Sequence, residues 1–282
     1  MLRLLFLIPM LALQFTSVDR TFNNSQYVEC RESLLAMLPE AADGHEKAEV
    51  LWRLSRVNLL LADATKDKAA KRELYGQGIR YAEEGIREDP GSEQCYMWHC
   101  ANTGREAGTH GLAEQAKTVS VIQQDLTMIL DKLGRIRCSE AWQAMSEYYW
   151  RHPLKSNDSA INYARRAVYT IPSRDLRLSS YLYLAQLLED RGWSAEKRAS
   201  HAAAHVAKFA QTQKPNTERY AFYDGSSDQM PWLKGAVGEV SDKEEATLLL
   251  EYALNMYDHC ASPFPVDRKD RQDILQWMKK RK

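Results

Sequence analysis

The sequence predicts an all-α protein built as a right-handed α-solenoid of antiparallel helix pairs, closed by a helical cap at its C-terminal end. Nearly every segment after residue 18 places apolar residues three or four positions apart, and almost none alternates apolar and polar residues as a strand does. Segments 78–90 and 160–172 also repeat one pattern: a small residue and Ile, then Tyr-Ala, then another small residue, ending at Pro. An internal repeat of helical segments is typical of stacked helix pairs.

Composition places the chain among ordinary globular proteins. It has 282 residues, of which 44% are hydrophobic and 27% charged, which is enough apolar material for a sizeable core. Lys and Arg total 38, as do Asp and Glu, so the formal net charge is zero and nothing favours a nucleic-acid partner. The 5 Cys residues are odd in number and too sparse for a disulfide framework, so we expect them in the core.

The N-terminus has the features of an export signal. Arg3 precedes the apolar run 4–13, which is too short for a typical membrane-spanning helix. The sequence Phe15-Thr16-Ser17 is a poor cleavage site, because a large residue stands where a small one is preferred. We therefore interpret residues 1–18 as a signal peptide or an N-terminal membrane anchor. This interpretation predicts an exported protein, periplasmic or membrane-anchored in a bacterial envelope.

The first helices are each delimited by an apolar stripe and a stop signal. Segment 26–38 ends before a proline, and 47–64 carries apolar residues at helical spacing. Segment 72–88 contains the first copy of the repeated pattern. The next four residues, Asp89-Pro90-Gly91-Ser92, combine a stop, a turn and an N-cap. We therefore expect the next helix at 92–106.

The middle of the chain continues in the same way. Segment 112–133 predicts one long helix closed by a glycine, and 139–150 begins at Ser139, a suitable N-cap. Segment 159–170 is the second copy of the repeated pattern. Segment 176–189 ends near a glycine, and 195–210 is a helix rich in Ala. The repeats are thus expected to span 19–210.

The character of the sequence changes after residue 210. Residues 211–241 contain proline, glycine and serine without a sustained period, so we expect a long connecting segment. Its aromatic residues predict that it packs onto the rest of the chain. Helical period returns at 243–258 and 268–278, and we interpret 242–282 as a C-terminal helical cap for the open end of the stack.

The repeated segments resemble the second helices of tetratricopeptide (TPR) repeats, and other segments resemble the first helices. A first helix of that family has a bulky residue, then Leu with a small neighbour, then an aromatic or aliphatic residue and a closing Gly. The positions that fit are Trp142, Met145-Ser146 and Tyr149; Tyr181, Leu184-Ala185, Leu188 and Gly192; and Leu51, Leu54-Ser55 and Asn58. Short side chains let paired helices approach closely, while bulky ones fill the gaps.

Residues 52–130 are similar to a narrower group, the regulator-of-microtubule-dynamics type of repeat protein, and to bacterial periplasmic repeat proteins associated with transporters. The segments that carry this resemblance are Leu51 to Arg56, Lys71 to Tyr75 followed by Asp89-Pro90, and Tyr96 to His99 before Gly104-Arg105. For an exported chain the resemblance implies no microtubule role. The resemblance implies a binding protein, and it suggests a transport assembly as one partner.

Residues capable of chemistry do not form a recognisable catalytic motif. His201 and His205 have the spacing of two metal ligands on one helix face, but Ala follows the first His and no third ligand can be assigned. We expect both imidazoles to face solvent. Cys95 and His99 share a face and are expected as a core thiol beside a hydrogen-bonded imidazole. The acidic pairs 83–84 and 244–245 are expected on exposed faces. We therefore predict no enzyme, metal or cofactor.

The remaining functional signal is the surface of the first helices, which line the concave face of such a stack. Aromatic, Arg and amide side chains are typical of a binding surface. The candidate groove residues are Arg53, Arg56, Trp98, Asn102, Arg105, Gln143 and Gln186. We hypothesise a non-enzymatic scaffold that binds a peptide or partner subunit there. The alternative is a periplasmic transport component that binds a small apolar ligand in a pocket enclosed by the helical repeats together with residues 211–240.

Overall fold

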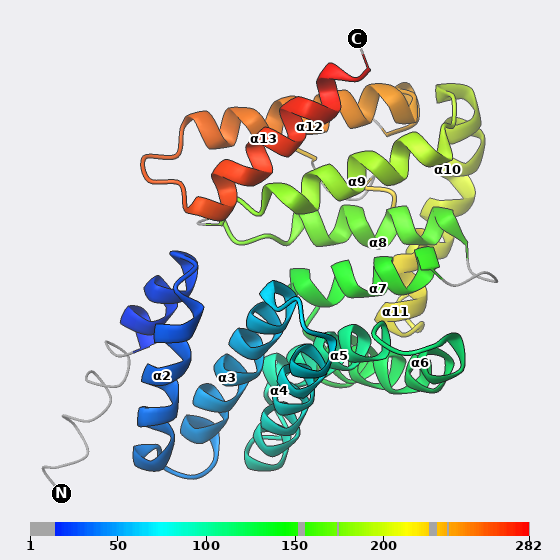
Figure 1. The fold of residues 1–282 in the computed structure, drawn as a ribbon. Coiled ribbons are helices and arrows are strands. Elements are labelled where there is room, and N and C mark those ends of the chain that lie inside the picture. The colour runs from blue at the N-terminus through cyan, green and yellow to red at the C-terminus, as the bar shows by residue number, and fades with distance from the viewer. Residues whose placement is uncertain (1–14, 152–155, 174, 226–229, 236, 282) are drawn as a thin grey trace, which may run out of the picture. The chain divides into compact units, whose positions relative to one another are not determined.

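The computed structural model describes residues 15–151, 156–173, 175–225, 230–235 and 237–281, and its regular structure in these ranges is helical, with no strand. The all-α prediction is confirmed. The chain divides into two compact units, residues 1–128 and 129–282 (Figure 1), and each is described by itself. The expected signal or anchor lies outside the described residues except for its last four positions. No helix of the described residues has the length and apolar character needed to cross a bilayer.

The first unit consists of helices joined by short turns. Residues 15–23 are helical and are called helix 15–23 below. The helices that follow are α2 (Tyr27–Met37), α3 (His45–Ala64), α4 (Lys68–Glu88), α5 (Glu93–Ala107) and α6 (Leu112–Thr127). Helix α4 begins earlier than expected because Asp67 caps it, accepting a hydrogen bond from the Ala70 amide at 2.8 Å. Ser92 caps α5, as the sequence predicted.

Helix α3 lies at the centre of the first unit, where it packs against α2, α4 and α5. The small residues of the repeated pattern in α4 allow this. A Cβ atom on Gly78 would lie 2.4 Å from Oδ1 of Asn102, and one on Gly85 would lie 2.5 Å from Sγ of Cys95. Both distances are below van der Waals contact, so only glycine fits between α4 and α5 at these two positions. The pattern seen in the sequence therefore marks close helix packing.

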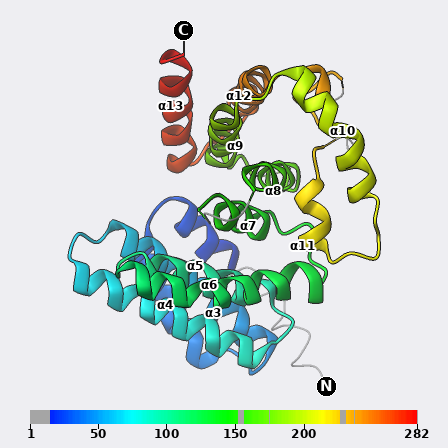
Figure 2. The ribbon, with the colours of Figure 1, turned by 90° about the vertical axis from the view of Figure 1, so that its right-hand side faces the viewer.

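A π-helical turn at Met128–Lys132 follows α6, within the segment where the sequence predicted one long helix ending at residue 133, and the second unit begins inside this turn, at residue 129. The helices that follow are α7 (Ser139–Arg151), α8 (Asn157–Tyr169), α9 (Leu178–Arg191), α10 (Ala195–Phe209), α11 (Asn216–Arg219), α12 (Asp242–Asp258) and α13 (Pro265–Lys279). Figure 2 views α7, α8, α9 and α12 nearly along their axes, with α10 and α11 on one side and α13 on the other.

Helix α12, rather than α10, packs most extensively against α9. Part of the connecting segment, at residues 217–222, packs on α8, as the aromatic content of the segment predicted. Asn162 donates a hydrogen bond to the carbonyl of Ala221 at 2.8 Å, and the Tyr163 hydroxyl donates to the carbonyl of Thr217. Tyr223 is 1% exposed, so this segment contributes to the core of the unit.

One sequence expectation is wrong in the second unit. Glu244 is exposed as expected, but Glu245 is wholly buried. Its carboxylate accepts hydrogen bonds from Arg165 at 3.0 and 2.7 Å and from Arg198. Burial alone would raise the pKa of Glu245, but the charges of Arg165 and Arg198 outweigh it and lower that pKa to about 2.

The ion pairs continue beyond Glu245 and connect four helices. Asp242, also wholly buried, accepts hydrogen bonds from Arg191 at 2.8 and 2.6 Å. Arg191 also pairs with Asp158 at the start of α8. The sequence missed this network because periodicity reports which face of a helix is apolar. It does not report that two carboxylates at the start of α12 meet arginines from α8, α9 and α10.

Candidate functional site

The predicted groove residues lie in both units. Five of them belong to the first unit: Arg53, Arg56, Trp98, Asn102 and Arg105. Gln143 and Gln186 belong to the second unit, on α7 and α9. The first unit brings four of its five together on one face of α3 and α5, and that face is the strongest candidate site.

Arg53 and Arg56 hold helix 15–23 against α3. The Asp19 carboxylate accepts two hydrogen bonds from Arg53, at 3.2 and 3.0 Å, and one from Arg56 at 2.7 Å. The guanidinium carbon of Arg53 lies 4.2 Å from the ring centre of Phe15, and that of Arg56 lies 3.7 Å from the ring centre of Phe22. Phe15, Asp19 and Phe22 of helix 15–23 therefore all contact the two arginines of α3.

The electrostatics of this contact favour the ionised carboxylate. Burial alone would raise the pKa of Asp19, but Arg53 and Arg56 lower it below its ordinary value. Burial lowers the pKa of Arg56, and its Nε has no hydrogen-bond partner among the described residues. Arg53 is better satisfied, because it also donates to the Glu49 carboxylate at 2.7 Å.

Trp52 connects the two arginines to α5. The guanidinium carbons of Arg53 and Arg56 lie 4.1 and 4.9 Å from its ring centre. Trp52 and Trp98 pack in the same cluster around Cys95. Arg105 lies further along α5, with its side chain 59% exposed and its guanidinium 4.0 Å from the carboxylate of Asp63 on α3. We call this surface the α3–α5 face; its residues are Trp52, Arg53, Arg56, Asp63, Trp98 and Arg105.

Asn102 does not belong to this face, which corrects its assignment as a groove residue. Its side chain is wholly buried on the side of α5 that faces α4. Its amide donates hydrogen bonds to the carbonyl and hydroxyl oxygens of Ser55, at 3.1 and 3.0 Å. Four positions separate Trp98 from Asn102, but the packing of α4 against α5 buries the second and leaves the first at the edge of the core. Asn102 therefore holds helices together and cannot contact a partner.

The two amides of the second unit differ in exposure. Gln186 is exposed on α9. Gln143 is half-buried on α7, and its amide donates to the Glu147 carboxylate at 3.3 Å. The Oε1 atom of Gln143 is buried without a hydrogen-bond partner among the described residues.

Phe15, Asp19 and Phe22 are the functional candidates that the sequence analysis missed. Phe15 fell within residues 1–18, which were interpreted as a signal or anchor, and Asp19 and Phe22 follow that segment directly. Their spacing of four and three positions places all three on one helix face, and that spacing is the signal that could have revealed them. Val18 of the same helix is buried beside Cys30, so helix 15–23 is part of the folded unit.

The expected core environment of Cys95 and His99 is confirmed. Cys95 is wholly buried, and the Nδ1 atom of His99 lies 2.7 Å from a carboxylate oxygen of Asp125 on α6. Burial would lower the pKa of His99, but Asp125 outweighs it and raises that pKa above its ordinary value.

The two histidines of α10 behave differently from each other. His201 is exposed, as expected, whereas the His205 side chain is 12% exposed, with Nε2 lying 3.1 Å from the Asp158 carboxylate. His205 therefore does not face solvent, and the sequence expectation is wrong for it. Among the described residues, no group of three or more His, Cys, Asp or Glu could hold a metal ion.

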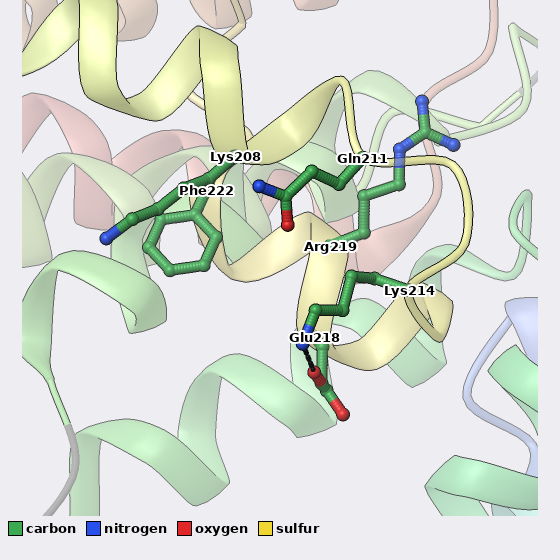
Figure 3. A pocket seen from close by; sticks show the side chains of 6 residues that line it. All are labelled: Lys208, Gln211, Lys214, Glu218, Arg219 and Phe222. Carbon is green, nitrogen blue, oxygen red and sulfur yellow. Dashed lines mark hydrogen bonds and ion pairs between the residues drawn. The ribbon is translucent and has the colours of Figure 1, made fainter.

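A pocket of about 260 Å³ lies where α10 meets α11 (Figure 3). Its lining residues are Lys208, Gln211, Lys214, Glu218, Arg219 and Phe222. Lys214 points at Glu218, and their charged atoms lie 3.1 Å apart. Figure 3 shows the charged ends of Lys208 and Arg219 on opposite sides of the Gln211 amide. Four of the six lining residues are charged, three of them basic and one acidic, so the lining carries a net positive charge.

Comparison with known proteins finds one similarity, and it lies in the first unit. Residues 14–128 match the family model RMD1-3, regulator of microtubule dynamics protein 1-3. The first unit is similar to that family. The similarity expected for residues 52–130 is thereby confirmed, and it extends toward the N-terminus to include helix 15–23. No curated protein matches the chain. The matched region contains the whole α3–α5 face together with the helix that lies on it.

Proposed function

We propose that this chain is a tetratricopeptide-like interaction scaffold whose α3–α5 face binds a helical segment of a partner protein. The observation that carries the proposal is that helix 15–23 already lies against this face. Phe15 and Phe22 contact the two arginines, and Asp19 pairs with both. A surface that holds a helix through aromatic, cationic and acidic contacts has the chemistry of helix-in-groove recognition.

Trp98 and Arg105 supply the part of the face that a partner would reach. Neither makes a hydrogen bond, ion pair or ring contact with helix 15–23 in the described part of the chain. Trp and Arg are the residue types that most often carry binding energy, and removing one such anchor costs about 2 kcal/mol or more. Arg53 and Arg56 are poorer targets for mutation, because replacing them would also release Asp19.

The cellular setting of the proposal rests on the sequence of residues 1–18. A protein exported to a bacterial envelope or anchored in it, with a transport assembly as partner, remains our proposal. The alternative of a small apolar ligand is not developed, because the pocket at residues 208–222 is lined by four charged side chains.

The test compares the double variant W98A/R105A with the control R80A. Arg80 is an exposed arginine of α4 whose only ion pair among the described residues is with Glu73 on the same helix, so its loss removes the same charge outside the α3–α5 face. Each tagged full-length chain is used to recover proteins from the native cell extract, and the recovered proteins are quantified by mass spectrometry. We expect W98A/R105A alone to lose specific partners.

A second control, H201A/H205A, separates this face from the histidine pair. Thermal unfolding followed by circular dichroism establishes that each variant is folded. Equal recovery by W98A/R105A and R80A contradicts the proposal, and loss of partners only in H201A/H205A moves the binding site to α10.

A further inference from the structure

One face of α10 carries cations held against aromatic rings. The Nζ atom of Lys197 lies 4.7 Å from the ring centre of Trp193, and that of Lys208 lies 4.6 Å from the ring centre of Phe222. Eleven positions separate the two lysines, so they share a helix face and lie about 16 Å apart along it. His201, on the same face, contacts Trp193 with ring centres 4.5 Å apart.

Arg219 adds a third cation next to a ring, just past the end of α10. Its guanidinium carbon lies 4.4 Å from the ring centre of Phe209, and its Nε donates to the Phe209 carbonyl at 2.7 Å. The pocket of about 260 Å³ opens between Arg219 and Lys208 (Figure 3). We call Lys197, Lys208 and Arg219 the α10 row.

The cations of the α10 row are positioned by rings and are not neutralised by carboxylates. None of the three makes an ion pair within the part of the chain that the structure describes. By contrast, Lys214 pairs with Glu218 at 3.1 Å. A ring fixes the position of a cation without cancelling its charge. The row is therefore preorganised, and an anion that binds it loses little side-chain entropy.

Acidic groups near the row are engaged elsewhere. Asp158 pairs with Arg191 and with His205. Glu196 lies about a quarter turn from Lys197 around α10, and its pKa is lowered by a hydrogen bond with Ser194. The positive potential of the row is thus left for a partner.

We infer that the α10 row is a docking surface for an acidic peptide segment of a partner protein, separate from the α3–α5 face. Charge complementarity identifies the occupant. An extended peptide rises about 3.3 Å per residue and its side chains alternate between two sides, so carboxylates four or six residues apart, at about 13 or 20 Å, bracket the distance between Lys197 and Lys208. The pocket beside Arg219 accommodates a further acidic side chain.

Two other anionic partners fit the geometry less well. Single-stranded nucleic acid binds proteins by stacking its bases on aromatic faces, but here cations occupy faces of Trp193, Phe222 and Phe209. Membrane surfaces are bound by helices that combine basic and apolar side chains. Val206, the exposed large apolar residue of α10, lies about half a turn from Lys197 and faces away from the row.

The experiment measures binding of a fluorescein-labelled octaglutamate peptide to the full-length chain by fluorescence anisotropy at low ionic strength. The test variant is K197Q/K208Q/R219Q. The matched control is K243Q/R268Q/K269Q, which removes two Lys and one Arg from exposed positions of the same unit. Parallel titrations use octaglutamine, an oligothymidylate of eight nucleotides, and vesicles of phosphatidylcholine with phosphatidylserine.

We expect the wild type and the control to bind octaglutamate with affinities within about twofold of each other, and the test variant to bind at least about tenfold more weakly. Octaglutamine should not bind. Equal weakening in both triple variants, or no binding by the wild type, overturns the inference. Tighter binding of oligothymidylate or vesicles than of octaglutamate overturns it in favour of those partners. Because the α3–α5 face is intact in every variant, failure here leaves the proposed function standing.

Discussion

Glu245 allows the sharpest test of how the second unit is held together. The change E245Q keeps the size and most of the hydrogen-bonding capacity of the side chain but removes its charge. Arg165 and Arg198 are then left in the core with one carboxylate fewer. Removing one partner of a buried ion pair costs about 3–5 kcal/mol, because the remaining charge is uncompensated.

A second estimate comes from the pKa of the carboxylate. The difference between its ordinary value of 4.5 and about 2 in the folded chain corresponds to about 3 kcal/mol of stability. The free energy obtained from the pKa therefore agrees with the cost expected for breaking a buried ion pair. For a unit that spans residues 129–282, a loss of this size lowers the melting temperature by about 10 °C.

The control is E244Q, one position earlier. Glu244 is exposed and accepts a hydrogen bond from the Ser241 amide at 2.7 Å, which Gln can also accept. Thermal unfolding followed by circular dichroism at pH 7 should show a large loss for E245Q and almost none for E244Q. Melting temperatures within about 2 °C of each other would refute the view that Glu245 is a buried charge compensating two arginines.

The pH dependence supplies an independent check with a definite sign. Because the pKa of Glu245 is lower in the folded chain, its stabilisation is fully present above the ordinary value of 4.5 and is lost as the pH falls toward about 2. The difference in stability between wild type and E245Q should therefore shrink as the pH falls through this window. A constant difference down to pH 2 would show that E245Q acts by another route.

Further predictions concern the first unit, and chemical unfolding in urea measures each of them. Gly78→Ala should destabilise it by about 1–3 kcal/mol through overpacking against Asn102, whereas Gly76→Ala, where nothing lies closer than 3.5 Å, should be neutral or stabilising; equal effects would contradict the close packing. Asp19→Asn should destabilise by about 1–2 kcal/mol, reduced by partial exposure of the carboxylate, and should speed proteolysis near residue 20; unchanged proteolysis would argue against a docked helix 15–23. Because the pKa of His99 is raised in the folded chain, the protonated imidazole stabilises the fold fully below about pH 6.5, and this stabilisation is lost as the pH rises through the pKa of the folded state. Wild type should therefore lose more stability than H99Q between pH 6 and 9, and equal losses would exclude this contribution.

The repeated pattern shows how far local sequence can reach. A small residue, Ile, Tyr-Ala and a second small residue predicted a tightly packed helix in both copies. Ala160 and Ala164 of the second copy are indeed wholly buried. Such a prediction succeeds because helical period and side-chain size are properties of one segment. They do not depend on which other segments pack against it.

The candidate site was only partly predictable. Residue type indicated Arg53, Arg56, Trp98 and Arg105, because Trp and Arg are typical of binding surfaces. Asn102 was wrongly assigned to the binding surface. A polar side chain can lie in the core when it has a buried hydrogen-bond partner, which for Asn102 is Ser55. Asp19 could not be assigned to Arg53 from sequence, because 34 positions separate them.

The sequence by itself determined the helical class, the approximate helix boundaries and the small residues at close contacts. Each of these follows from steric and hydrophobic preferences within one turn or one segment. Only the tertiary structure decided that Glu245 is buried while Glu244 is exposed, and that α12 packs against α9. Those outcomes depend on which distant arginines and helices arrive at the same place, and the favourable energy of a buried charge pair exists only after both partners have been brought together.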